Sequence, residues 1–408
     1  MMKIGHLWLL LLFFISPLIS QQFFQNHPEL SWRVYETENF RVYYTQETAW
    51  TAKKASLIAE EVFVNISRFY DFKPDKKYDL VLKDVDDYSN GGAYFFNDKV
   101  EIWSENLDYP MRGTSHWLYN VLTHELTHMI NIQASIKTSK TIPFGFLQIM
   151  SYEKEFRKDV IRGFPNVIAS YPISSVNFPV WFAEGTAQYQ NSWSRHDYRD
   201  SHREMVLRDR FVHDRVLSYS SMGVFGKNSI GNESAYNQGF SFVKFLATTY
   251  GDSILEKIVR ENSHMGNWTF ESAFESAVGI DVEIAYDNWV EERQQFYSKQ
   301  LSLIKEHLVI GTPLERDGFA NLSPRFSPDG RKVAYLTNRQ SDYWSQNKLI
   351  LKDISTGAEI KVADRVASAS AFSPDGRYLA YSKTLDDNSA GSMFNDIEPA
   401  LLSSRVFE

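Results

Sequence analysis

The chain has 408 residues, 43% of them hydrophobic and 15% aromatic, which is enough to fill the cores of two or three domains. Its 43 basic and 51 acidic residues give a formal net charge of −8, and no basic run indicates nucleic-acid binding. It contains no cysteine, which excludes disulfides, lipid attachment through cysteine and thiolate metal ligands.

Residues 1–20 are predicted to be a secretory signal peptide. A lysine precedes an apolar run from Leu7 to Ile15, and small and polar residues follow before position 21. The run is too short for a comfortable membrane span, so a retained anchor is the alternative. The expected location is outside the cytoplasm, either periplasmic or at the cell surface or secreted, in a bacterial envelope.

The next two segments predict an α+β fold. Residues 21–115 contain expected strands at 33–35, 40–44, 79–83 and 100–103 and a long helix at 49–70. Residues 116–308 are largely helical by pattern. A small sheet packed on a helical body is the architecture that this order favours.

Residues 117–133 predict a helix that carries the pattern His-Glu-Leu-Thr-His. The stretch has no proline or glycine, and its apolar residues recur at helical spacing. His124 and His128 are four residues apart, so both imidazoles can face one cation from the same helix face. Glu125 lies beside them, where a carboxylate can take a proton from a zinc-activated water. The pattern predicts a zinc site with Glu125 as general base.

A third metal ligand is expected farther along the chain. Glu153 and Glu155 are candidates, but their charged surroundings favour a solvated helix face. Glu184 follows Pro179, which suits the first turn of a helix, and stands among aromatic and small residues. A carboxylate is costly there unless it is paired or metal-bound, and the small residues would let this helix approach the His-Glu-Leu-Thr-His helix closely. Glu184 is the preferred ligand.

These motifs resemble the gluzincins of the peptidase MA clan, and most closely its peptidase MA-like branch. The resemblance covers about residues 31–300 and rests on HELTH, on PVWFAEGTAQY and on SAYNQGFSFVKFL. It implies Zn²⁺ held by His124, His128 and Glu184, with Tyr236 as a catalytic phenol that stabilises the oxyanion. It also implies that residues 90–94 form a turn and 100–103 an edge strand, which together flank the substrate cleft.

One exclusion and two departures from the gluzincin pattern narrow the class of peptidase. Asn131 and Ala134 stand where metzincins carry a glycine and a third histidine. The segment GGAYFFND lacks the glutamate with which aminopeptidases of the clan hold a free amino terminus, which favours an endopeptidase or a peptidase of another, unassigned specificity. Glu184 lies 56 residues beyond His128, so an insertion separates them. It could be a lid, a substrate wall or a membrane-facing flap, but plain core packing is the simpler expectation.

A repeat begins after the helical part. Phe326 and SPDGRKVAY return as Phe372 and SPDGRYLAY, shifted by 46 residues, and each Pro-Asp-Gly predicts a tight turn between two strands. The repeats resemble TolB-like or WD-like β-propellers. Because two blades cannot close a propeller, residues 309–408 are expected to be a partial propeller of a longer protein.

The sequence therefore predicts an exported zinc metallopeptidase that cleaves a peptide or protein substrate. An envelope protein bound by the propeller is the expected partner, and membrane contact is a further expectation. The alternative is a catalytically idle exported scaffold that acts through its propeller.

Overall fold

A computed structural model of the chain describes residues 27, 29–84, 90–104, 117–137, 146–151, 167–172, 178–193, 201–223, 229–341, 346–366, 369–383 and 403–407. The predicted signal, residues 1–20, lies outside the described residues. Among the helices that are described, none is both long and apolar enough to cross a membrane.

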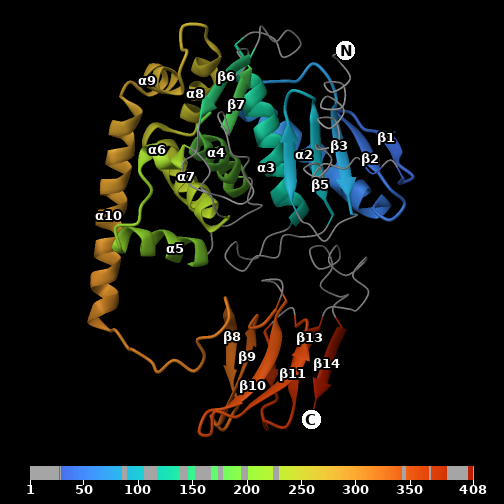
Figure 1. Ribbon diagram of the computed structural model, residues 1–408, viewed down its shortest axis with the longest axis vertical. Coiled ribbons are helices and arrows are strands. Elements are labelled where there is room, and N and C mark those ends of the chain that lie inside the picture. The colour runs from blue at the N-terminus through green and yellow to red at the C-terminus, as the bar shows by residue number, and fades with distance from the viewer. Residues whose placement is uncertain are drawn as a thin grey trace, which may run out of the picture.

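Five strands form the N-terminal sheet, in the order β1-β2-β3-β5-β4 (Figure 1). The inner strands β2, β3 and β5 are parallel, whereas β1 and β4 run antiparallel to their neighbours at the two edges. The strands are β1 (Arg33–Glu36), β2 (Phe40–Tyr44), β3 (Tyr78–Lys83), β4 (Gly91–Tyr94) and β5 (Lys99–Trp103). The four strands expected from the sequence are confirmed to within one residue.

The expectation that residues 90–94 form a turn is wrong, and so is the expectation that 100–103 form the edge strand. Strand β4 is itself the edge, and β5 lies between β3 and β4. The turn that joins them lies at residues 95–98, where Asp98 adopts a positive φ of 53°. Two consecutive glycines favour a turn by propensity, but here both belong to a strand, and at Gly91 helix α3 packs too closely for a side chain.

Helices α2 (Ala49–Phe69) and α3 (Trp117–Ala134) pack on one face of this sheet. The expected helix at 49–70 is confirmed. Alternate residues of the inner strands, such as Leu80, Leu82, Val100 and Ile102, are fully buried in the core on this side. The sheet therefore supports α3 from behind.

The helical body continues from α3, and one hydrophobic core runs from the sheet through it. Helix α10 lies along the outer edge in Figure 1 and ends close to the expected limit of the helical part. The helices are α4 (Val180–Trp193), α5 (Ser201–Val212), α6 (Tyr219–Met222), α7 (Ser229–Tyr250), α8 (Ser253–Ser263), α9 (Phe270–Val278) and α10 (Val282–Glu306).

The insertion between the second histidine and Glu184 contains a two-stranded antiparallel ribbon. Strand β6 (Phe146–Ser151) pairs with β7 (Val167–Pro172), and neither pairs with another described strand. Glu153 and Glu155, the weaker ligand candidates, lie outside the described residues.

The C-terminal part contains two antiparallel sheets, seen below the helical body in Figure 1. A core of Ala334, Leu336, Leu349, Val366, Leu379 and Tyr381 joins residues of both. The first sheet has the order β11-β10-β9-β8 and the second β12-β13-β14. Their strands are β8 (Asn321–Phe326), β9 (Lys332–Thr337), β10 (Lys348–Asp353), β11 (Glu359–Asp364), β12 (Ala371–Phe372), β13 (Leu379–Lys383) and β14 (Ser403–Phe407). The described strands form no closed propeller, and these sheets do not by themselves support one.

The repeated turn is confirmed in detail. In the first copy Gly330 has a φ of 70°, and its N–H donates to the Ser327 carbonyl over 2.8 Å. In the second copy Gly376 has a φ of 72°, and its N–H donates to the Ser373 carbonyl over 2.9 Å. Each turn joins the two strands of a hairpin, β8 to β9 and β12 to β13. Glycine, which has no Cβ, adopts such a φ at little steric cost.

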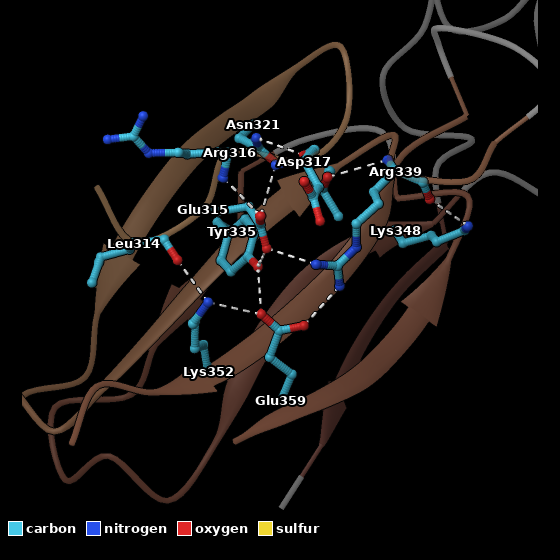
Figure 2. Close-up of polar contacts among 11 residues, drawn as sticks. Leu314, Glu315, Arg316, Asp317, Asn321, Tyr335, Arg339, Lys348, Lys352 and Glu359 are labelled. Atoms are coloured by element: carbon cyan, nitrogen blue, oxygen red, sulfur yellow. Dashed lines mark hydrogen bonds and ion pairs between the residues drawn. The ribbon is translucent and has the colours of Figure 1, made fainter. Parts of the chain in front are cut away.

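The segment after α10 is fastened to the first C-terminal sheet by a polar network (Figure 2). Glu315 pairs with Arg339 over 2.7 Å, and Arg339 pairs in turn with Glu359 over 2.7 Å. Tyr335 donates toward both carboxylates, while the Lys352 ammonium bonds the Leu314 carbonyl and Glu359. The network holds residues 314–315 against the sheet face opposite the shared core.

Candidate metal centre

Helix α3 places the two histidines in the interior. The helix lies between the sheet on one side and α4 on the other, so most of its residues are buried. His124 and His128 are each 9% exposed, and their rings meet edge to face with centroids 4.7 Å apart. The four-residue spacing thus brings both imidazoles to one side of the helix, as the sequence predicted.

Helix α4 brings the carboxylate. Its first turn is fixed by Pro179, whose carbonyl accepts the N–H groups of Phe182 and Ala183. Glu184 follows in the next turn and is 9% exposed. Its Oε2 lies 2.9 Å from Nε2 of His124 and 3.4 Å from Nε2 of His128. Residues that are 56 or more positions apart in the sequence therefore meet at one point.

The donor set of this cluster fits a zinc ion. The two Nε2 atoms are 3.0 Å apart, and the potential ligand atoms of His124, His128 and Glu184 all lie within 4.8 Å of one another. Two atoms bound tetrahedrally to one zinc at about 2.0–2.1 Å lie about 3.3 Å apart, close to the observed separations. Two nitrogens and a carboxylate oxygen are also ligands that zinc accepts. The cluster is compatible with zinc binding.

The charges of the cluster favour a ligand carboxylate. Burial opposes ionisation of Glu184, but the charges and hydrogen bonds of His128 and His124 outweigh it and hold the pKa of Glu184 far below its usual value. Burial also opposes protonation of His128, yet the nearby Glu184 and Glu125 raise the pKa of that imidazole. Glu184 is therefore ionised at neutral pH and able to bind a cation.

Glu125 is held next to the ligands by the edge strand. It is 8% exposed, and strand β4 passes directly over it. A Cβ atom added to Gly91 would lie 2.7 Å from Oε1 of Glu125 and 2.5 Å from Cγ2 of Val121. The absence of a side chain at Gly91 leaves the space that the carboxylate occupies. Sequence reasoning missed this role, because the glycine pair was interpreted as a turn.

Tyr236 reaches the same place from α7. Its ring lies beside that of His124, with centroids 6.1 Å apart and an angle of 31° between the planes. The structure thus brings together all five residues that the sequence singled out, three as a ligand cluster and two beside it. What Glu125 and Tyr236 do there remains a prediction.

Two glycines allow α7 to pack closely against α4. A Cβ at Gly185 would lie 2.5 Å from the Gly239 carbonyl oxygen, and a Cβ at Gly239 would lie 2.5 Å from the Trp181 carbonyl oxygen. Gly185 follows Glu184 directly, and Gly239 is one helical turn after Tyr236. The expectation that small residues bring α4 close to α3 is corrected at Gly185, which faces α7 instead. The glycine contact joins the helices that carry Glu184 and Tyr236.

Comparison with known proteins gives partial likenesses. No protein-family model matches the chain, and no curated protein matches it. Among solved structures it is similar to an M1 zinc metallopeptidase from Deinococcus radiodurans, with 13% identity and a TM-score of 0.33, over 64% of this chain and 51% of that one. A mutant of that enzyme bound to a Tyr-Ser-Ala substrate is similar over the same shares, with 12% identity and a TM-score of 0.33. The chain thus matches about half the length of each.

Proposed function

We propose that this protein is a zinc-dependent peptidase. The observation that carries the proposal is the convergence of His124, His128 and Glu184 within 4.8 Å, with Glu125 and Tyr236 beside them. A structural ion pair alone would not require a second buried carboxylate and a phenol at the same point. The arrangement matches the roles needed for hydrolysis, namely metal ligands, a base and a hydrogen-bond donor.

In this mechanism a side chain of the protein transfers the proton of the attacking water. His124, His128 and Glu184 would hold a zinc ion, which would supply the Lewis acidity that polarises a peptide carbonyl and lowers the pKa of a water. Glu125 takes the proton from the attacking water and delivers it to the leaving amine. Tyr236 donates a hydrogen bond to the oxygen on which negative charge develops.

The edge strand offers a place for an extended substrate. The Trp103 N–H donates to the Asn90 carbonyl, so in this antiparallel pair Asn90, Gly92 and Tyr94 bond to β5. The peptide groups of Gly91 and Ala93 consequently point toward the edge with which no described strand pairs. A substrate strand that pairs with them is held beside Glu125.

We propose an endopeptidase rather than an aminopeptidase. Within the described residues, strand β4 and the preceding Asn90 carry no carboxylate that could hold a free amino terminus. Glu101 on the neighbouring strand lies on the opposite sheet face, where it pairs with Lys83 and Lys99. An extended chain can then continue past the site in both directions.

We further propose that the protein is exported and that its C-terminal repeats belong to a propeller that binds an envelope partner. The signal-like residues 1–20 support export, and the repetition of one turn geometry after 46 residues supports a blade-like repeat. Secretion into the periplasm or medium, followed by the mature N-terminus at residue 21, tests the first part. Retention of uncleaved chain in the cytoplasm would contradict it.

The central test combines metal analysis with a peptide library. Wild-type protein is expected to carry one zinc per chain and to cleave internal peptide bonds, and a chelator should abolish cleavage. Glu125→Gln should keep its zinc and lose cleavage, because the base is gone and the ligands remain. Cleavage by Glu125→Gln at the wild-type rate would remove Glu125 as base. Zinc without any cleavage by wild type would favour the idle scaffold.

A further inference from the structure

Polar side chains from three segments meet in the interior beside the metal cluster. Tyr70 directly follows α2, Asn131 lies on α3, and Thr186 and Gln190 lie on α4. Tyr70 is 3% exposed and the other three are fully buried. Asn131 is one helical turn beyond His128, and Thr186 is two residues beyond Glu184. The polar cluster therefore adjoins two of the metal ligands along the chain.

Direct hydrogen bonds join α3 to α4 on both sides of the histidines. The Asn131 amide donates to the Thr186 hydroxyl over 3.0 Å, and the Asn191 amide donates to the Asn120 carbonyl oxygen over 2.6 Å. Asn120 precedes His124 by four residues, and Asn131 follows His128 by three. This spacing places the two asparagines on the same helix face as the histidines. The two bridges thus bracket the segment that must stay near Glu184.

The direct bonds leave several buried polar atoms unsatisfied. Tyr70 Oη, Asn131 Oδ1 and both amide atoms of Gln190 have no hydrogen-bond partner within the described part of the chain. Each unsatisfied group costs about 1–3 kcal/mol in the interior. Together they offer a hydroxyl, an N–H donor and two carbonyl acceptors, and a buried water typically makes about two to four such bonds.

These groups lie close enough to share such partners. Burial raises the pKa of the Tyr70 phenol strongly, and the nearby side chains of Gln190, Thr186 and Asn131 each oppose that rise. The Tyr70 hydroxyl is thus near polar atoms of both α3 and α4. A water shared among these atoms would satisfy hydrogen bonds that the side chains leave unmade.

We propose that Tyr70, Asn131 and Gln190 bind internal water, and that this hydrated network positions α4 so that Glu184 stays against the two histidines. The hydration site is inferred from the buried polar atoms and does not depend on the proposed function. The positioning role does rest on the proposed metal function. Gln190 and Tyr70 are positioning residues, because neither is part of the ligand cluster.

The first test is a high-resolution crystal structure of the zinc-loaded protein. Ordered water is expected within hydrogen-bond distance of Tyr70 Oη and of the Gln190 amide. Direct bonding of these side chains to one another, with no water density between them, would overturn the hydration site.

The second test measures how fast zinc leaves the protein when excess chelator is added. Gln190→Met removes both amide atoms at similar volume and should speed zinc release about 10-fold, the lower end of the affinity loss seen when the groups that orient metal ligands are disturbed. Tyr70→Phe should also speed zinc release. In the double variant the acceleration should be smaller than the product of the two single accelerations, because both side chains act through the same water.

Asn262 on α8 provides the matched control. It is fully buried and both of its side-chain amide atoms also lack a described partner, but it bonds neither α3 nor α4 through its side chain. Asn262→Leu should change the unfolding midpoint and leave zinc release at the wild-type rate. Equal zinc release in wild type, Gln190→Met and Asn262→Leu would overturn the positioning role. Wild-type protein that binds no zinc would overturn that role together with the proposed function, while the density still decides the hydration site.

Discussion

The side chain of Glu125 on α3 occupies the space that a side chain at Gly91 on the edge strand would need. A Cβ at position 91 would lie 2.7 Å from Oε1 and 2.8 Å from Cγ of Glu125, distances that carbon atoms do not tolerate. The strand and the helix are therefore fitted to each other at the residue proposed as general base. Glycine is required here by contact, since its φ is not in the left-handed region.

Gly91→Ala should displace Glu125 and leave the metal ligands in place. We expect kcat to fall about 100-fold, since a shift near 1 Å can cost that much, with zinc content unchanged. Gly92→Ala is the matched control, because a Cβ there meets only the Tyr94 ring at 3.4 Å or more. Steady-state kinetics on a cleaved library peptide measure both variants. Equal kcat values for the two variants would show that this contact does not position the base.

Glu184→Ala should raise the dissociation constant for zinc at least about 100-fold, because a ligand and the charge that balances the cation are both lost. Gln188→Ala controls for the loss of a side chain from the same helix at the same 9% exposure. Competition against a chromophoric chelator gives the constants. If Glu153→Ala weakened zinc binding more than Glu184→Ala, the ligand role would pass to Glu153.

The sequence was sufficient to predict contacts that depend on the spacing of nearby residues. His124 and His128 need only a helix to meet, and the repeated Ser-Pro-Asp-Gly turn closes within a few residues. Pairing of Glu184 with the histidines was inferred from its unfavourable apolar neighbours rather than from any spacing.

Contacts that depend on tertiary packing could not be predicted. The glycines of β4 have a low strand propensity, and the contact with Glu125 that leaves no room for a side chain at Gly91 is visible only in the folded chain. Gly185 was expected to serve the contact with α3, whereas it serves α7, because a sequence does not show which neighbour a small residue faces. The buried amides Asn131 and Gln190 carried no recognisable pattern either.

Gly239→Ala should push α4 and α7 apart, since the added Cβ would meet only backbone atoms of Trp181, at 2.5–3.1 Å. We expect a stability loss of about 1–3 kcal/mol from overpacking, together with faster zinc release as Glu184 moves. Gly266→Ala, where a Cβ meets nothing within 4 Å, should change neither property. The double variant Gly185→Ala, Gly239→Ala should lose less unfolding free energy than the sum of the two single losses. One separation of the helices relieves both clashes. Strict additivity would indicate that the glycines do not share a contact.

The buried pair of Lys83 and Glu101 gives a pH-dependent prediction away from the metal. Lys83 Nζ lies 2.6 Å from one Glu101 oxygen, and Lys99 Nζ lies 2.7 Å from the other. Burial opposes ionisation of Glu101, but the two lysines outweigh it and hold the pKa of Glu101 below its usual value. A lowered folded-state pKa contributes stability that is complete above the unfolded value, about 4.3, and is lost as the pH falls through the folded value.

Glu101→Gln should therefore destabilise the protein by about 3 kcal/mol at pH 7, because it leaves the buried Lys83 ammonium without its counter-charge. The difference from wild type should stay constant down to about pH 5 and begin to shrink near pH 4, where the carboxyl of the unfolded chain takes up a proton. It should reach its minimum once the pH has also fallen through the lowered pKa of the folded carboxyl. Denaturant unfolding at several pH values measures this difference. Glu36→Gln, which removes the exposed partner of Lys77, should have an effect near zero at every pH, since exposed pairs contribute little. A Glu101→Gln penalty that persisted unchanged at pH 3 would mean that packing, and not charge, is what Glu101 provides.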